Sequence, residues 1–228
     1  MAGDYGDWLD ASMDIMEETR FKKRHKPLIQ RLEKKLHFDY VELEALSIMY
    51  YKLEKENEHH GQGKRERGVT KIQFRDMLHC ALDMTDDNLM DRMFLAVDKG
   101  PSPFITMETW ATTLSLFLRG TLEEKINFCF TVYDIMGEGV LARDNIFHLL
   151  RGSMVSQGGE DADESVKDMI EVITKKMDLD RDGKISFNDY KQSVLKNPML
   201  LEVFGQCLPS RMAAYSFLTT FTHTPPTL

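Results

Sequence analysis

Apolar residues recur along this chain at the three- to four-residue spacing of amphipathic helices, and the helices flank short polar loops. The pattern predicts helices over residues 39–55, 71–80, 86–97 and 122–133. A further apolar stripe precedes residue 178 and consists of Val166, Met169, Ile170, Ile173 and Met177. The helices form four helix–loop–helix units. Because one such unit cannot bury its apolar face alone, the sequence predicts two pairs of units in an all-α fold.

The same pattern divides the chain into four segments. We expect a partly helical N-terminal extension over residues 1–36, a first pair of units over 37–119, a second pair over 120–204 and a C-terminal tail over 205–228. Each loop carries an aliphatic residue near its end, including Val69, Ile105 and Ile185. These residues predict a short strand contact between the two loops of each pair. Thr121 with Glu124 predicts a capping box that starts the helix over 122–133.

One loop has a pattern that indicates a specific chemistry. Residues 178–189 read Asp-Leu-Asp-Arg-Asp-Gly-Lys-Ile-Ser-Phe-Asn-Asp, with an oxygen ligand at every second position and Gly183 at the sharp turn. This pattern is typical of an EF-hand calcium loop. The expected ligands are the carboxylates of Asp178, Asp180 and Asp182, the backbone carbonyl of Lys184, a water held by Ser186, and the carboxylate of Asp189. The alternative interpretation is an aspartate-rich surface turn before a helix.

The last ligand position departs from the usual pattern. A glutamate there normally supplies both carboxylate oxygens, and Asp189 is one methylene shorter. Bidentate capture is harder for the shorter side chain. We therefore expect weaker calcium binding at this loop and relatively better magnesium binding.

The other three loops are predicted not to hold calcium. The first, within residues 56–68, is too long and basic; the second and third begin at Asp98 and Asp134 and have lost ligands. The third loop has a thioether and a neutral amide at positions that need charged oxygens. The disqualifying residues are Lys64, Arg65 and Arg67 in the first loop, Gly100, Pro103 and Thr109 in the second, and Met136 and Asn145 in the third.

The N-terminal extension changes charge along its length. An acidic part with an apolar strip at roughly helical spacing (Trp8, Leu9, Met13 and Met16) precedes a basic cluster over residues 20–26, and Pro27 is expected to interrupt it. One interpretation is a solvated, partly helical tail. The other is a docking helix whose basic end meets an acidic surface, such as that of tubulin.

Two further segments connect or end the predicted units. Residues 156–163 are rich in glycine and acidic residues and predict a flexible linker. The C-terminal tail is more apolar than a linker, and we expect it either to fold back onto a groove or to dock on a partner. Its apolar residues are Tyr215, Phe217, Leu218 and Phe221.

Composition narrows the class of protein. The 228 residues carry a net charge of −8, which argues against nucleic acid as the main partner. Three cysteines without metal-type spacing suggest a reducing compartment, and Cys80 and Cys129 are expected to be core thiols. There is no long apolar run and no signal core, and Ala2 stands where N-myristoylation needs a glycine, so we expect a soluble intracellular protein without a membrane anchor. The motifs of a phosphate loop, a zinc protease or a nucleophile elbow do not occur, so an enzyme is not expected.

Three segments resemble the calaxin family. They are residues 83–92 (DMTDDNLMDR), 114–125 (LSLFLRGTLEEK) and 200–209 (LLEVFGQCLP), and the resemblance extends over about residues 38–209. The calaxin family consists of EF-hand proteins of cilia and flagella that are related to the neuronal calcium sensors. The resemblance implies a two-lobed EF-hand fold with four helix–loop–helix units. Carried over to this chain, the calcium ligands of that family are complete only at 178–189.

The resemblance also implies a location and partners. It implies an axonemal protein of cilia or flagella that contacts the outer dynein arm heavy chain, the coiled coils of the docking complex, and tubulin of the doublet microtubule. Three hypotheses follow: a calcium-responsive adaptor, a structural axonemal subunit without a calcium switch, and a regulatory subunit of a soluble enzyme. The first two differ in whether partner affinity changes with calcium.

Overall fold

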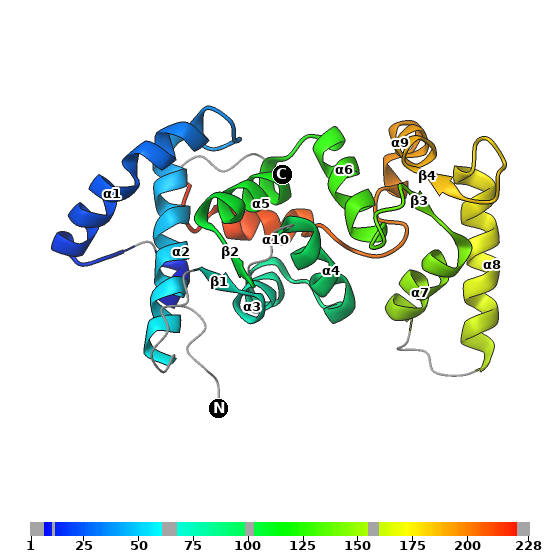
Figure 1. Ribbon diagram of the computed structural model, residues 1–228, viewed down its shortest axis with the longest axis horizontal. Coiled ribbons are helices and arrows are strands. Elements are labelled where there is room, and N and C mark those ends of the chain that lie inside the picture. The colour runs from blue at the N-terminus through cyan, green and yellow to red at the C-terminus, as the bar shows by residue number, and fades with distance from the viewer. Residues whose placement is uncertain (1–6, 11, 61–67, 99–102, 155–159, 223–228) are drawn as a thin grey trace. The chain divides into compact units, whose positions relative to one another are not determined.

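The fold is all-α, as predicted, with two short antiparallel strand pairs (Figure 1). The computed structural model describes residues 7–10, 12–60, 68–98, 103–154 and 160–222. The helices are α1 Ile15–Glu33, α2 Tyr40–His60, α3 Lys71–Leu82, α4 Asp87–Val97, α5 Met107–Arg119, α6 Leu122–Tyr133, α7 Arg143–Met154, α8 Glu160–Met177, α9 Phe187–Lys196 and α10 Arg211–Leu218, with 3₁₀ turns η1 Asp7–Leu9 and η2 Pro198–Leu200. The strands are β1 Val69–Thr70, β2 Phe104–Ile105, β3 Val140–Leu141 and β4 Ile185–Ser186.

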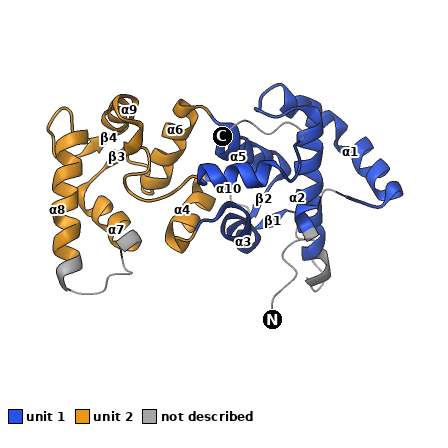
Figure 2. Ribbon diagram, turned by 180° about the vertical axis from the view of Figure 1, so that it is seen from behind, with its two compact units in different colours: residues 1–84, 97–120, 209–228 blue, residues 85–96, 121–208 orange. Residues whose placement is uncertain are grey.

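The helices gather into two compact units (Figure 2). Unit 1 comprises Met1–Met84, Val97–Gly120 and Pro209–Leu228, and unit 2 comprises Thr85–Ala96 and Thr121–Leu208. In unit 1, α2 packs against α1 and α5, and α10 packs against α3 and α5. In unit 2, α8 packs against α7 and α9, and α6 packs against α7 and α9.

Each strand pair joins two loops through the aliphatic residues near the loop ends. Val69 lies opposite Ile105 in unit 1, and Leu141 lies opposite Ile185 in unit 2. All four side chains are fully buried. The predicted strand contact between paired loops is therefore confirmed. In unit 2 this contact joins the loop that begins at Asp134 to the loop at 178–189.

The capping box at the start of α6 is also confirmed. The Glu124 backbone N–H donates to Thr121 Oγ1 at 3.3 Å, and the Thr121 backbone N–H donates to Glu124 Oε2 at 2.7 Å. These two bonds satisfy donors that a helix start leaves open. The helix begins at Leu122 and ends at Tyr133, as the apolar spacing predicts.

The N-terminal extension corrects two expectations. Pro27 does not interrupt the basic segment, because α1 continues through it to Glu33, with Ile29 and Leu32 buried beyond it. The apolar strip is not one helix: Trp8 lies in η1 and packs edge-on against Trp110, while α1 starts after Asp14. Asp14 sets that start by accepting the backbone N–H groups of two α1 residues.

Other boundaries also differ from the predictions. The sequence predicts the first loop over 56–68, but α2 continues to His60. It predicts a linker over 156–163, but α8 already begins at Glu160. The rest of that linker, residues 156–159, lies outside the described residues. Cys129 is buried as expected, whereas Cys80 is exposed, because it stands on the outer face of α3.

The C-terminal tail folds back, which was one of its two predicted alternatives. Helix α10 packs on α3 and α5, and Phe217, Leu218 and Phe221 are buried. Phe221 meets Phe38 edge-on with ring centroids 6.0 Å apart, and Phe217 lies 5.6 Å from Phe221. The part of the tail that contains α10 and Phe221 therefore belongs to the core of unit 1.

A buried ion pair joins three parts of unit 1. Arg119, at the end of α5, donates to both carboxylate oxygens of Glu42 at 2.8 and 2.6 Å and to the His37 carbonyl at 2.9 Å. Its guanidinium also lies over the Phe38 ring. The Glu42 side chain is only 5% exposed, so this charge relies on its partner.

Glu42 should make the stability of the protein fall in acid. Burial alone would raise the pKa of Glu42, but the bonds from Arg119, Thr222 and the Asp39 backbone lower it below its ordinary value of 4.5. A lowered pKa in the folded state means that the stabilisation is present above the unfolded pKa and is lost as the pH falls through the folded pKa. We expect the free energy of unfolding to fall less between neutral pH and pH values below 4.5 in Glu42→Gln than in the unmodified protein. Urea unfolding curves recorded at both pH values measure this fall. An equal acid effect in both proteins would contradict this.

Candidate metal centre

The loop between α8 and α9 is shaped by its own aspartates. Asp178 follows α8 and accepts the backbone N–H of Asp182 on Oδ1 at 3.2 Å and that of Gly183 on Oδ2 at 3.0 Å. Gly183 has φ +84°, in the left-handed region that a side chain disfavours. The chain therefore turns sharply at the position where an EF-hand loop needs glycine.

Three carboxylates converge inside this turn. Ligand oxygens of Asp178, Asp180 and Asp182 lie within 4.8 Å of one another, with Asp178 half-buried and the other two exposed. Three like charges at this separation repel, and hard cations such as calcium take several carboxylate oxygens at once. The cluster could hold a metal ion, and its donor set fits calcium.

Asp189 is the residue that anchors the loop to α9. Its side chain is buried, and Oδ2 accepts the Ser186 backbone N–H at 3.1 Å and the Ser186 hydroxyl at 2.6 Å. The Asp189 backbone N–H donates back to Ser186 Oγ at 3.2 Å, which completes a capping box at the start of α9. The predicted last ligand thus has a second role as a helix cap, which sequence reasoning missed although the Ser-x-x-Asp spacing carries the signal.

The charges of the loop act on one another. The Asp182 backbone N–H lowers the pKa of Asp180. Partial desolvation, the negative charges of Asp182 and Asp189 and the hydrogen bond with Asp178 raise it, and the pKa of Asp180 ends above its ordinary value. Asp189 is therefore close enough to act electrostatically on the cluster, although it lies outside the group of three. Of the other predicted ligands, Lys184 donates its backbone N–H to Asp182 Oδ1 at 2.8 Å, and Ser186 caps α9.

The loop that pairs with this one keeps the turn and lacks part of the ligand set. Asp134 accepts the backbone N–H groups of Glu138 at 3.0 Å and Gly139 at 2.7 Å, which repeats the arrangement around Asp178. Met136 stands where Asp180 stands in the intact loop, and it is 68% exposed. Among the residues that the structure describes, three carboxylates converge only at 178–182.

The first and second loops fall partly outside the described residues, at 61–67 and 99–102. In the second loop, Thr109 holds the last ligand position. The Thr109 hydroxyl lies 2.9 Å from that of Thr106, and the Thr109 backbone N–H donates to Thr106 Oγ1 at 3.2 Å. The position therefore serves the start of α5, as Asp189 serves α9.

Lengthening the last ligand should strengthen calcium binding. Asp189→Glu adds one methylene, so the carboxylate reaches further into the loop and can present both oxygens to the ion. We expect calcium affinity to rise by about tenfold relative to magnesium, since calcium accepts bidentate carboxylates more readily. Calorimetric titration with each ion checks this. Unchanged affinity for both ions would show that the shorter side chain already reaches the metal.

Comparison with known proteins decides the family. A family model described as an EF-hand domain pair matches residues 123–195. The chain is 43% identical over 182 residues to calaxin of Xenopus laevis, covering 79% of this chain and 86% of that protein, and 40% identical over 198 residues to calaxin of Homo sapiens, covering 86% and 92%. The chain belongs to the calaxin family. The predicted resemblance is thus confirmed.

The wider relationships agree with a calcium-binding EF-hand protein. The chain is 32% identical over 183 residues to the calcium-binding protein NCSA of Dictyostelium discoideum, covering 78% of this chain and 91% of that protein. The matched EF-hand pair contains the loop with the three converging aspartates. None of the described helices is both long and apolar enough to cross a membrane.

Proposed function

We propose that this member of the calaxin family is an EF-hand adaptor of the axoneme in cilia or flagella. It docks on outer dynein arms and their docking complex on the doublet microtubule, and it is not an enzyme. The proposal rests on membership of the calaxin family together with one loop, 178–189, that keeps a calcium-binding set of carboxylates. That loop, with three carboxylates within 4.8 Å of one another, is the observation that carries it.

The loop offers a physical route from calcium to the rest of unit 2. A bound cation would offset the repulsion among Asp178, Asp180 and Asp182 and attract Asp189. Asp189 caps α9, so its movement would change the angle between α8 and α9. The strand contact of Leu141 with Ile185 passes the change to the paired loop. Magnesium demands stricter octahedral geometry, so it would move these helices differently.

A structural subunit without a calcium switch is the second candidate. The observation that favours it is the loop at 134–145, which keeps the turn around Asp134 and has an exposed methionine in place of a ligand. A ligand shifts a conformational equilibrium only by its differential affinity for the two states. One loop supplies less of that free energy than several loops do.

The deciding experiment measures ion binding and docking on the same protein. Calcium is titrated calorimetrically in the presence of millimolar magnesium, and the protein is then cosedimented with doublet microtubules that carry or lack outer dynein arms. Binding that requires the arms and changes with calcium supports the adaptor. Arm-dependent binding that ignores calcium supports the structural subunit, and binding that does not depend on the arms contradicts both.

A further inference from the structure

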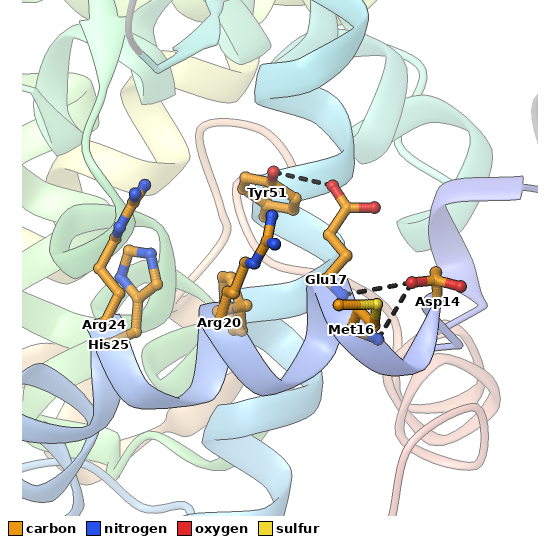
Figure 3. A pocket seen from close by; sticks show the side chains of 8 residues that line it. Asp14, Met16, Glu17, Arg20, Arg24, His25 and Tyr51 are labelled. Carbon is orange, nitrogen blue, oxygen red and sulfur yellow. Dashed lines mark hydrogen bonds between the residues drawn. The ribbon is translucent and has the colours of Figure 1, made fainter.

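Helix α1 and the neighbouring α2 enclose a hollow of about 440 Å³ in unit 1 (Figure 3). The hollow lies far from the metal loop in sequence, in the N-terminal extension, and within the size range of ligand pockets. Figure 3 shows the side chains of Arg20, Arg24 and His25 leaving α1 on the side where Tyr51 of α2 lies. The exposed charged side chains at its rim and the aromatic side chains at its floor indicate which class of ligand the hollow can bind.

The rim carries uncompensated positive charge. Arg20 and Arg24 stand one helical turn apart, and both are exposed. In the part of the chain that the structure describes, no carboxylate pairs with either guanidinium. Lys23 and Lys26 are exposed on the same helix and increase the local positive potential. The charge is a local reversal, because the whole chain carries −8.

The two acidic side chains that line the hollow already have partners. Asp14 accepts the backbone N–H groups at the start of α1, at 3.0 and 3.3 Å. Glu17 accepts the Lys55 ammonium at 2.8 Å and the Tyr51 hydroxyl at 2.9 Å, and these bonds lower the pKa of Glu17. Lys55 thus offsets the charge of Glu17, whereas Asp14 keeps its charge, so the two arginines leave the lining with one net positive charge.

The floor of the hollow is aromatic. Phe21 is 4% exposed, and its ring lies 4.4 Å from that of His25 and 5.3 Å from that of Tyr51, measured between centroids. Burial and the charge of Arg24 lower the pKa of His25, so at neutral pH it offers a ring and no charge. Met16, 67% exposed, adds a flexible apolar side chain at one end. An apolar group would lie on this floor between the two guanidiniums.

We propose that this hollow binds an acidic peptide segment of a partner protein, with carboxylates on Arg20 and Arg24 and an apolar side chain against Phe21. Guanidinium groups pair with carboxylates through two parallel hydrogen bonds, which gives such a site direction as well as charge. An anionic membrane is a poorer occupant, because a flat bilayer surface does not enter a hollow lined by Phe21 and Tyr51. The hollow does not include the loop at 178–189, so peptide binding can be tested independently of calcium binding.

The test uses the full chain and a short fluorescein-labelled peptide of glutamates around one central phenylalanine. Binding is followed by fluorescence anisotropy at physiological ionic strength, with calcium and with chelator. We expect the double reversal R20E/R24E to weaken binding by about tenfold or more, because two attractive pairs become repulsive. The matched control K23E/K26E changes the net charge equally on the same helix outside the hollow, and we expect a loss below about threefold.

Three further arms keep the result interpretable. A peptide in which glutamine replaces every glutamate should not bind, and the affinity should fall with added salt. Circular dichroism melts should be the same for both double variants, since all four residues are exposed. An equal loss of peptide affinity in R20E/R24E and K23E/K26E would show that only the net charge of the helix matters, and it would overturn the proposed binding site. Stronger binding to phosphatidylserine vesicles than to the peptide would overturn the choice of partner.

Discussion

Asp178→Ala should lose cation binding at the loop between α8 and α9. The substitution removes one of three converging carboxylates, and it also removes the oxygens that accept the backbone N–H groups of Asp182 and Gly183. The remaining ligands then carry one negative charge fewer, and the turn that positions them is no longer held. We expect calcium affinity to fall by about a hundredfold or more, as measured by calorimetry.

The paired loop provides the matched control. Asp134 accepts backbone N–H groups in the same arrangement, and the described residues place no second carboxylate cluster there. Asp134→Ala should therefore perturb its loop to a similar extent and leave the binding stoichiometry unchanged. If Asp134→Ala abolished binding while Asp178→Ala retained it, the metal site would lie in the third loop.

Arg119→Met should destabilise unit 1 strongly. It retains much of the aliphatic volume but leaves the Glu42 carboxylate buried without its cation, and it removes the donor to the His37 carbonyl. Breaking one side of a buried pair typically costs about 3 kcal/mol of unfolding free energy. Chemical denaturation with urea, followed by circular dichroism, measures the loss.

Two variants separate this effect from ordinary loss of an arginine. Arg31 pairs with Glu108 in the same unit, but both side chains are about half exposed, at 54% and 46%. Arg31→Met should cost less than about 1 kcal/mol, because exposed pairs contribute little. Adding Glu42→Gln to Arg119→Met removes the stranded charge and should recover part of the loss. Equal costs at Arg119 and Arg31 would show that the burial of Glu42 is not what matters.

The helices and the metal loop can be predicted from local sequence because local interactions specify them. The start of α6 depends on Thr121 and Glu124, three residues apart, and the turn at Gly183 depends on aspartates within the same loop. The strand contact of Leu141 with Ile185 follows from the repeat of the loop pattern. Boundaries are harder to predict, as at Pro27, because buried neighbours hold a helix together through a residue that disfavours it.

The all-α EF-hand architecture, the loop at 178–189 and the resemblance to the calaxin family can all be read from the amino-acid sequence, since each depends on short spacings along the chain. Other features are decided only in the folded molecule. They are the choice between the two predicted alternatives for the tail, which packs through Phe217 and Phe221 into unit 1, the pairing of Glu42 with Arg119, and the hollow that Arg20 borders with Tyr51. These pairings join residues far apart in sequence. No local pattern fixes them, because their partners come together only when the folded chain brings distant segments into contact.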